Sequence, residues 1–430
     1  MNKPTPLILA AVAVYAFAGC NRGTGNSVIP MEDSWDKTLG FLLTVGADVT
    51  HGEVQTNSPN YAYVWNAEDL ANDFRATNSQ SNLGGYDVGF LDLQDGRPDP
   101  LPPGGDTPET RLRTLQWWIY EADGVGHPDW IVYQCDGVTP AYLGNPPGTY
   151  PNMPLDFTNP AVVDWKLKTF LDRAQPSVTA LSADFFSPAN LTHACGIYRD
   201  GQWVQLFTGE AYDPVFDAAV FNWAKEARRR LAKQLYPKGL VVNCPPVPSF
   251  EEQTIAALEE SVDGILDEYG FTYSDPNTRD IWWPIKIRRM IQFQDAGLAY
   301  YSVNYIDRFP PTLEELNWIL GSFLMAREHS AYIEISQKPT ADSSYPDWPH
   351  LPEYDVNVGH PCGAMTMSQG VYVRDFSKGM ALVNPSASDS FTVALPPGNF
   401  TDLGGEQVAG NIFIGPLSGK VLVSSQDRCR

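Results

Sequence analysis

The sequence predicts an α/β fold, a (β/α)8 TIM barrel followed by a small C-terminal antiparallel β-sandwich domain. Short apolar runs alternate with helical segments through most of the chain, which is the order of elements in such a barrel. The runs are apolar on both faces, as strands buried on both sides of a parallel sheet are. After about residue 346, period-2 alternation broken by Gly, Pro, Asn and Ser replaces the helical segments. A doubly wound open sheet is the competing architecture, but no glycine-rich turn follows the first predicted strand.

Eight apolar runs of four to seven residues are the predicted barrel strands. They are residues 61–65, 88–92, 130–134, 180–185, 240–243, 264–268, 299–305 and 331–336. Four helices are predicted between them, at residues 159–174, 213–235, 249–260 and 312–328. The first two open with Asn-Pro and Asp-Pro, and the other two open with Ser or Thr followed three residues later by Glu, which is typical of a helix start.

The N-terminal residues predict export. Lys3 precedes an apolar run of 13 residues at 7–19, which is too short to span a bilayer and is typical of a signal peptide. The run ends in Phe-Ala-Gly-Cys, which resembles a bacterial lipoprotein signal with Cys20 as the lipidated residue. We therefore expect attachment to the cell envelope, outer membrane or surface through this lipid alone, or secretion if cleavage near Gly19 leaves no lipid. The predicted division is a signal peptide at 1–19, a linker at 20–40, the barrel at 41–345 and the β domain at 346–430.

Charge and cysteine usage exclude several classes of function. The formal net charge of -22 repels nucleic acids and anionic lipid headgroups. No cysteine or histidine spacing is typical of a metal site, and no nucleophile elbow or glycine-rich phosphate loop is present, so we expect neither metal nor cofactor. Cys362 and Cys429 lie at the two ends of the β domain, and an exported chain favours a disulfide between them.

Carboxylates follow two of the predicted strands. In a barrel, catalytic residues gather at the carboxyl ends of the strands, where Asp184 closes the fourth strand and Asp267 and Glu268 close the sixth. Because strand side chains alternate, Asp184 shares a face with small residues, which predicts that it points into the barrel. On the sixth strand the same reasoning favours Glu268 through Gly264, and Asp267 remains the alternative. Glycoside hydrolysis needs such a pair, one acid to protonate the leaving oxygen and one carboxylate as nucleophile or base.

Polar and aromatic residues near the predicted strand ends are candidates for binding a sugar. Flat aromatic faces stack against sugar rings, while acids and amides accept hydrogen bonds from the hydroxyl groups. Residues 280–284, Asp-Ile-Trp-Trp-Pro, are predicted to lie in a loop after the sixth strand. The candidates are Asp92, Tyr133, Asp136, Asn243, Tyr269, Trp282, Trp283, Tyr301, Asn304 and Glu334.

Several stretches resemble bacterial glycoside-hydrolase-like barrel proteins related to the endo-α-1,4-polygalactosaminidase and α-galactosidase-type barrels. These stretches are PDWIVYQCDG, LDFTNPAVVDWKLKTFLDRA, LSADFFSPAN, VDGILDEYGF and the tail from GVYVRDFSKGMALVNPS, within about residues 60–425. The resemblance implies a barrel with a C-terminal β domain that acts on carbohydrate outside the cytoplasm. It also implies Asp184 as nucleophile and a strand-six acid as general acid/base. Strand six has Asp-Glu where these relatives have a single Asp, so Asp267 remains an alternative to Glu268.

Together, these observations predict an exported glycoside hydrolase that cleaves a polysaccharide or oligosaccharide through a carboxylate pair. A surface glycan-binding lipoprotein on a catalytically inactive barrel is the alternative, since it would keep the aromatic residues without needing the carboxylates. An exported barrel enzyme of another class, such as a deacetylase or esterase, is less favoured because neither a metal-ligand cluster nor a nucleophile elbow is present.

Overall fold

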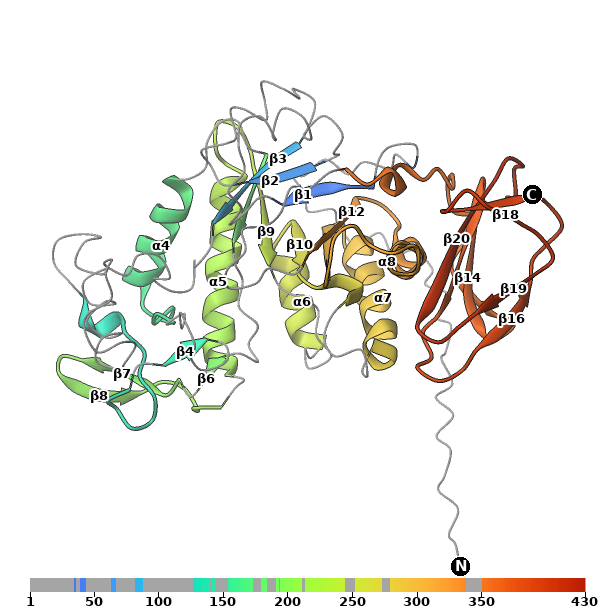
Figure 1. Ribbon diagram of the computed structural model, residues 1–430. Coiled ribbons are helices and arrows are strands. Elements are labelled where there is room, and N and C mark those ends of the chain that lie inside the picture. The colour runs from blue at the N-terminus through green and yellow to red at the C-terminus, as the bar shows by residue number, and fades with distance from the viewer. Residues whose placement is uncertain are drawn as a thin grey trace, which may run out of the picture.

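The computed structural model describes residues 35, 39–43, 63–66, 82–87, 127–139, 141–143, 154–172, 179–183, 191–192, 194–210, 213–243, 252–272, 279–337 and 350–429. They form a mixed α/β structure, in which one parallel sheet is covered by helices and separate antiparallel sheets follow toward the C-terminus (Figure 1). Within these ranges, no helix combines the length and the apolar character needed to cross a membrane.

The parallel sheet contains eight strands, and neighbouring strands are parallel throughout. Gly40 forms a parallel bridge with Ile333, whose N–H donates to the Leu39 carbonyl at 2.9 Å, so the first and last strands meet. The complete (β/α)8 arrangement stays a prediction, because the connections between the first three strands lie outside the described residues. In sheet order the strands are β1 (Phe41–Leu43), β2 (Tyr63–Asn66), β3 (Asn82–Asp87), β5 (Ala180–Ala183), β9 (Gly239–Asn243), β10 (Gly264–Asp267), β11 (Ala299–Ile306) and β12 (Ala331–Gln337).

One predicted strand differs from the structure, and another cannot be compared with it. The run 130–134 is not part of the sheet, because Ile131 and Tyr133 form isolated antiparallel bridges with Leu155 and Gly196 instead. The run 88–92 lies outside the described residues, and β3 precedes it. A short buried apolar run looks the same in a sheet as in a packed loop, so periodicity alone could not separate them. The sheet begins with β1, which the sequence does not predict. With β1 counted, β5 and β10 are the fourth and sixth strands of the sheet, as predicted.

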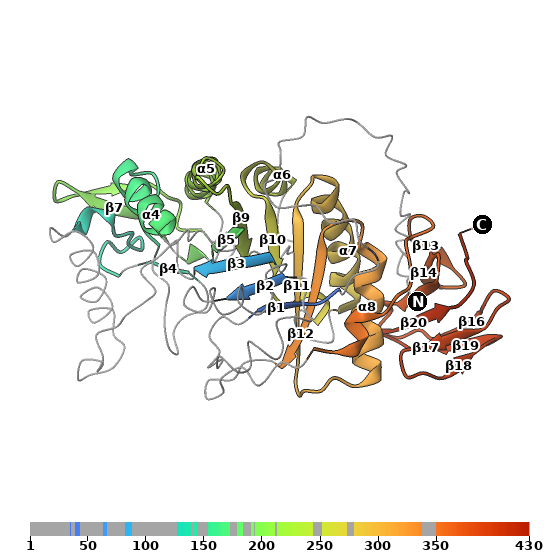
Figure 2. The same cartoon turned by 90° about the horizontal axis from the view of Figure 1, so that it is seen from above.

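Five helices are described between the strands, and Figure 2 shows them in succession along one face of the sheet. The four predicted helices are confirmed, with Asp213 accepting from the Val215 and Phe216 amides and a capping box between Thr312 and Glu315. The predicted loop at 280–284 is wrong, because these residues lie in α7. The helices are α4 (Pro160–Asp172), α5 (Pro214–Leu231), α6 (Glu252–Ser261), α7 (Arg279–Asp295) and α8 (Leu313–Ala326).

Pro284 explains why α7 was missed. A proline inside a helix removes one backbone hydrogen bond, which makes the surrounding sequence look like a loop. In the structure the adjacent Trp283 is buried, its indole N–H donates to Ser322 Oγ of α8 at 2.8 Å, and its ring lies 4.8 Å from that of Tyr372. We infer that this burial outweighs the lost helical hydrogen bond.

Apolar side chains of the parallel sheet form two separate clusters. Val241, Leu266 and Tyr301 belong to a cluster on the face away from the helices, which we call the interior cluster. Ile265 and Tyr300 belong to the larger cluster shared with the helices. Because strand side chains alternate between the two faces, membership of a cluster tells which way each neighbouring residue points.

Two segments that follow β3 and β5 come together in a small lobe, which we call the disulfide lobe (residues 127–143 and 191–210). A disulfide joins Cys135 to Cys195, across 60 residues of sequence. In Figure 1 the lobe lies at the end of the molecule opposite the C-terminal sheets. Its elements are a 3-10 helix (Pro128–Trp130), the paired strands β4 (Tyr142–Leu143) and β6 (Leu191–Thr192), and the hairpin β7 (Gly196–Arg199) and β8 (Gln202–Gln205).

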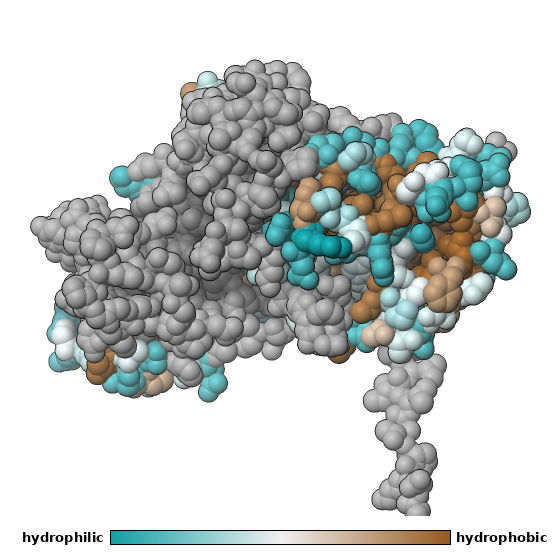
Figure 3. All heavy atoms as spheres, in the orientation of Figure 1, coloured by the Kyte–Doolittle hydropathy of each residue, from teal (hydrophilic) through white to brown (hydrophobic). Residues whose placement is uncertain are grey.

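The C-terminal strands form a six-stranded and a two-stranded antiparallel sheet that share one apolar cluster. The six-stranded sheet has the order β13 (Thr366–Ser368), β14 (Val371–Phe376), β15 (Gly379–Asn384), β20 (Ser418–Ser424), β17 (Phe400–Asp402), β18 (Gln407–Val408). The other sheet pairs β16 (Phe391–Ala394) with β19 (Asn411–Ile414). Figure 3 shows apolar residues gathered over this part of the chain, where Met367 and Phe413 are exposed.

Helix α8 holds the C-terminal sheets against the parallel sheet. Asn317 Oδ1 accepts from the Val421 amide at 2.9 Å, and Gly321 lies beside Val383, so the helix packs closely on β15 and β20. The buried Arg374 of β14 donates to the carbonyls of Leu324 and Arg327, at 3.0 and 2.6 Å. These contacts satisfy carbonyl groups at the end of α8 that have no partner within the helix.

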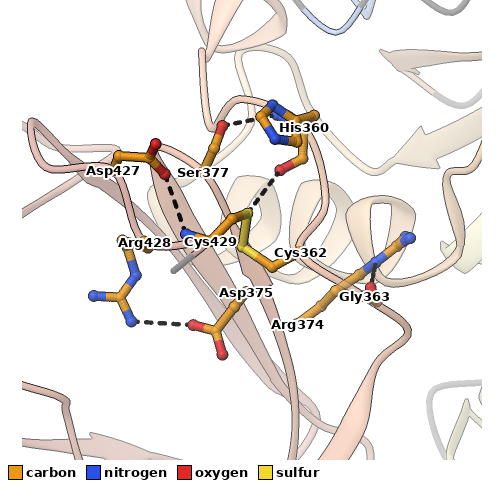
Figure 4. Close-up of a disulfide and its surroundings, with 9 residues drawn as sticks. All are labelled: His360, Cys362, Gly363, Arg374, Asp375, Ser377, Asp427, Arg428 and Cys429. Carbon is orange, nitrogen blue, oxygen red and sulfur yellow. Dashed lines mark hydrogen bonds and ion pairs between the residues drawn. A yellow bond between two sulfur atoms is a disulfide. The ribbon is translucent and has the colours of Figure 1, made fainter.

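The predicted disulfide between Cys362 and Cys429 is confirmed (Figure 4). It ties the end of the chain to the segment before β13. Beside it, Arg428 Nη2 lies 3.1 Å from Asp375 Oδ1, and Ser377 Oγ accepts from the His360 amide at 3.1 Å. The chain closes these sheets with a covalent link as well as with polar contacts.

Replacing Cys362 and Cys429 together by serine should lower the free energy of unfolding by about 3–4 kcal/mol. The disulfide joins two cysteines that are 67 residues apart in the sequence. A closed loop of this length strongly restricts the unfolded chain. Urea unfolding of the double variant and the wild type, followed by circular dichroism, measures the loss. Equal unfolding midpoints and slopes for the two proteins would contradict the expectation.

Candidate active site

The carboxyl end of β10 directs Asp267 and Glu268 to opposite faces of the sheet. Glu268 shares its face with Leu266 of the interior cluster, whereas Asp267 shares its face with Ile265 of the helix-side cluster. Asp267 is 1% exposed, and Glu268 is half-buried. Of these two adjacent carboxylates, Glu268 is the one directed to the interior face and reached by solvent.

Two neighbouring strands hold the Glu268 carboxylate. Asn243 Nδ2, at the end of β9, donates to Glu268 Oε2 at 2.9 Å. The Tyr305 hydroxyl, near the end of β11, donates to Glu268 Oε1 at 3.0 Å. Each carboxylate oxygen therefore accepts one hydrogen bond from a side chain on an adjacent strand, which orients the group at the carboxyl edge of the sheet.

Asp267 lies in a buried ion pair on the helix side. Its Oδ1 contacts Lys286 Nζ of α7, and its Oδ2 accepts from the Tyr300 hydroxyl at 2.5 Å. Burial raises the pKa of Asp267 above its usual value, while the positive charge of Lys286 and the two hydrogen bonds act in the opposite direction. With all three groups enclosed between the sheet and α7, this carboxylate serves to join the sixth strand to its helix.

The turn after β10 has an uncommon backbone conformation. Tyr269 has a φ of 79°, a region that residues other than glycine rarely adopt, and its ring lies 5.1 Å from that of Tyr305. At Gly270 a Cβ atom would lie 2.4 Å from Ser302 Oγ, so no larger residue fits there. Asn304 Oδ1 accepts from the Phe271 amide at 2.7 Å and fixes the turn to β11. The strained residue directly follows Glu268, and such strain tends to gather at functional sites.

Three predicted binding residues lie close to this carboxylate or behind it. Asn243 and Tyr269 belong to the cluster around Glu268, as described above. Asn304 is fully buried on the face of the sheet opposite to Glu268. Its side chain accepts a hydrogen bond from the Phe271 amide and so holds the backbone of the turn after Glu268. Tyr305 is not among the predicted binding residues, yet its hydroxyl group donates a hydrogen bond directly to Glu268. The signal that could have found it is its alternation with Tyr301 and Val303 along β11.

The other predicted binding residues on the sheet and on α7 are farther from an open surface. Tyr301 is fully buried in the interior cluster, with its ring centroid 5.5 Å from that of Phe41 and 5.3 Å from that of Trp65. It therefore packs inside the sheet and does not lie at the rim. Glu334 of β12 is 4% exposed. Trp282 is half-buried in the first turn of α7, and Trp283 is buried against Ser322, so neither lies in a rim loop.

The remaining predicted residues lie in the disulfide lobe or outside the described residues. Tyr133 is 7% exposed and packs on Tyr198, with ring centroids 5.5 Å apart. Asp136 is exposed, and its carboxylate accepts from the Val138 and Thr139 amides and from the Thr139 hydroxyl, which forms a local turn. Asp92, Asp184 and Cys20 lie outside the described residues. Within the part of the chain that is described, no three His, Cys, Asp or Glu side chains gather to hold a metal ion.

A family comparison gives the class of protein that this chain is similar to. Residues 304–380 match the model of hypothetical glycosyl hydrolase family 15. The matched segment runs from the end of β11 through α8 and β12 into β15. Asp184 and Glu268 lie outside it. No curated protein matches the chain.

Similar solved structures include three carbohydrate-active enzymes at low sequence identity. A cycloisomaltooligosaccharide glucanotransferase from Paenibacillus sp. has 8% identity and a TM-score of 0.41, with 92% of this chain and 56% of that chain covered. A dextranase from Flavobacterium johnsoniae has 11% identity and a TM-score of 0.43, with 92% and 52% covered. A debranching enzyme from Nostoc punctiforme has 10% identity and a TM-score of 0.45, with 91% and 99% covered. The chain thus spans about half the length of the first two.

Proposed function

We propose that this chain is a glycoside hydrolase in which Glu268 is the general acid/base and Asp184 is the nucleophile. The observation that carries the proposal is the placement of Glu268 at the carboxyl end of the sixth strand, half-buried and oriented by Asn243 and Tyr305. The match of residues 304–380 to a glycosyl hydrolase family model supports the same class. In this role Glu268 protonates the leaving oxygen and then activates water.

The assignment of Asp184 rests on strand alternation. Ala180 of β5 belongs to the interior cluster and Leu181 to the helix-side cluster, which supports the alternation from which the sequence predicts that Asp184 points into the barrel. Ala183 pairs with Val242 of β9, and Leu266 pairs with Asn243 one position further along β9. In the sequence Asp184 directly follows β5, and β5 lies two strands from β10 in the sheet. A carboxylate there would attack the sugar carbon while Glu268 protonates the leaving group.

The proposal includes a completed (β/α)8 barrel, the C-terminal β domain as a separate unit, and export with a lipid at Cys20. Eight parallel strands whose first and last members meet support the barrel. The apolar run at 7–19 before Cys20 supports export. Incorporation of labelled palmitate into the full chain, and its loss in Cys20→Ser, tests the anchor; a wild type without label would contradict it.

The test of the proposed function uses the soluble chain that starts after Cys20. It is incubated with bacterial, fungal and plant polysaccharides, and the release of reducing ends is measured. We expect release from at least one polysaccharide, with its loss in Asp184→Asn. Full activity in Asp184→Asn would overturn the assignment of the nucleophile. Binding to a polysaccharide with no release of ends would favour a surface glycan-binding protein instead.

A further inference from the structure

Two partly exposed aromatic rings lie side by side on the hairpin β7–β8 of the disulfide lobe. Tyr198 and Trp203 are paired across the two strands, so both side chains lie on the same face of the hairpin. Their ring centroids are 5.4 Å apart, and each residue is 36% exposed. Large aromatic residues that stay exposed on a fixed scaffold are a recurrent sign of a binding surface.

The surroundings of the two rings hold them in place. The Tyr198 hydroxyl donates to the Gly137 carbonyl at 2.9 Å, in the turn next to Cys135. The Trp203 indole packs against two glycines. A Cβ atom would lie 3.7 Å from the indole at Gly137 and 2.9 Å from it at Gly196. The Cys135–Cys195 disulfide joins the turn to the start of the hairpin. Since these contacts already hold the two rings, the protein would lose little side-chain entropy when a ligand binds them.

The order of the elements indicates that the hairpin lies at the same edge of the parallel sheet as Glu268. The lobe follows β3 and β5 in the chain and leads into the starts of α4 and α5. In alternating strand–helix units, each helix starts beside the carboxyl end of the strand before it. Arg199 of the hairpin lies 3.6 Å from the buried Asp156, four residues before α4, and holds the hairpin there.

The residues beside the rings indicate the chemistry of the ligand. Gln205, two residues after Trp203 on β8, lies on the same face of the hairpin as the rings and is exposed, so an amide group borders the apolar faces. A sugar presents apolar C–H faces bordered by hydroxyl groups, which fits aromatic rings beside an amide. The net charge of -22 disfavours acidic polysaccharides.

We propose that Tyr198 and Trp203 form an accessory binding platform for a neutral polysaccharide, remote from the hydrolysed bond. The proposal rests on the proposed function and extends it to the substrate class: a polymer long enough to reach both the platform and Glu268. Stacking of a sugar ring on Trp203, whose ring plane is inclined by 63° to that of Tyr198, retains the chain, while Gln205 bonds its hydroxyl groups. A short oligosaccharide bound at Glu268 does not reach the platform, so its binding does not depend on Tyr198 and Trp203.

Binding is measured in the Glu268→Gln background, so that it does not depend on turnover. The probes are pullulan, dextran and laminarin as neutral polymers, with alginate as the acidic polymer, in affinity gel electrophoresis and calorimetry. Adding Trp203→Ala should weaken binding of the retained neutral polymer about tenfold, and Trp203→Phe should weaken it less. The matched control is Tyr236→Ala, an aromatic residue 56% exposed in the turn between α5 and β9, which should leave binding unchanged.

The outcomes separate the platform from the hydrolase. Thermal unfolding of each variant first establishes that the lobe is folded. Equal binding with and without Trp203, stronger binding of alginate, or no binding of any neutral polymer would overturn the platform. If wild type binds a neutral polymer through Trp203 but never cleaves it, the platform stands and the proposed hydrolysis fails. If Trp203→Ala cleaves a long polymer with unchanged KM, hydrolysis stands and the platform fails.

Discussion

Replacing Glu268 by glutamine should lower the rate of polysaccharide hydrolysis by about a hundredfold or more, with the fold unchanged. Glutamine keeps the shape of the side chain, and its amide oxygen can accept from Asn243 while its NH2 group donates to the Tyr305 hydroxyl, but it cannot deliver a proton to the leaving oxygen. Glu268 is half-buried and makes no ion pair among the described residues, so its neutralisation leaves no buried charge without a partner. Reducing-end release and thermal unfolding of the same preparation measure the two effects.

Two further variants make the Glu268 result specific. Glu260→Gln removes an exposed carboxylate near the end of α6, which pairs with Lys225, and should leave the rate unchanged. Tyr305→Phe removes one of the two hydrogen bonds to Glu268 and should lower kcat about tenfold. Activity of Glu268→Gln close to that of the wild type would exclude this residue as the acid/base. A reduced melting temperature in Glu268→Gln would mean that the loss reflects folding instead.

Replacing Lys286 by methionine should lower the free energy of unfolding by about 3–5 kcal/mol, the largest stability effect that we expect in this chain. Lys286 and Asp267 are 2% and 1% exposed, so the variant leaves a carboxylate buried without its cation. Among the described residues, the Tyr300 hydroxyl is then the side-chain group left to stabilise that charge. Urea unfolding of the variant and the wild type at neutral pH measures the loss.

The loss in Lys286→Met should shrink as the pH is lowered. Burial already raises the pKa of Asp267, and removing Lys286 raises it further. The folded variant then binds a proton that the unfolded chain has released, so its stability is lower above this raised pKa and recovers as the pH falls toward about 4, the usual value for aspartate. A loss that is constant between about pH 8 and pH 5 would contradict this account.

An exposed pair provides the matched control for the buried one. Lys225 and Glu260 lie 2.9 Å apart with both side chains exposed, so Lys225→Met should cost about 1 kcal/mol or less. The double variant Asp267→Asn with Lys286→Met has no unpaired charge and should be more stable than Lys286→Met alone. Equal losses in Lys225→Met and Lys286→Met would show that burial of the pair is not the cause.

The local patterns of the sequence were a good guide to the elements but not to their partners. The four helices with a recognisable start were confirmed, because capping depends on residues within one turn of each other. The apolar run at residues 130–134 predicts a barrel strand, yet its partners are Leu155 and Gly196, which no local pattern identifies. Pro284 makes the sequence around Trp282 and Trp283 resemble a loop, because the stability of this helix comes from contacts with α8 and β14.

The sequence by itself determined the alternation of strands and capped helices, the change to antiparallel strands after about residue 346, the Cys362–Cys429 pair and the carboxylates that close the sixth strand. These features depend on spacing along the chain. Only the tertiary structure shows that Asp267 and Glu268 point to opposite faces of the sheet. Two adjacent carboxylates look alike in a sequence, and their difference arises from the face that the helices cover. Lys286 of α7 neutralises one of them there, while Asn243 and Tyr305 orient the other at the open edge.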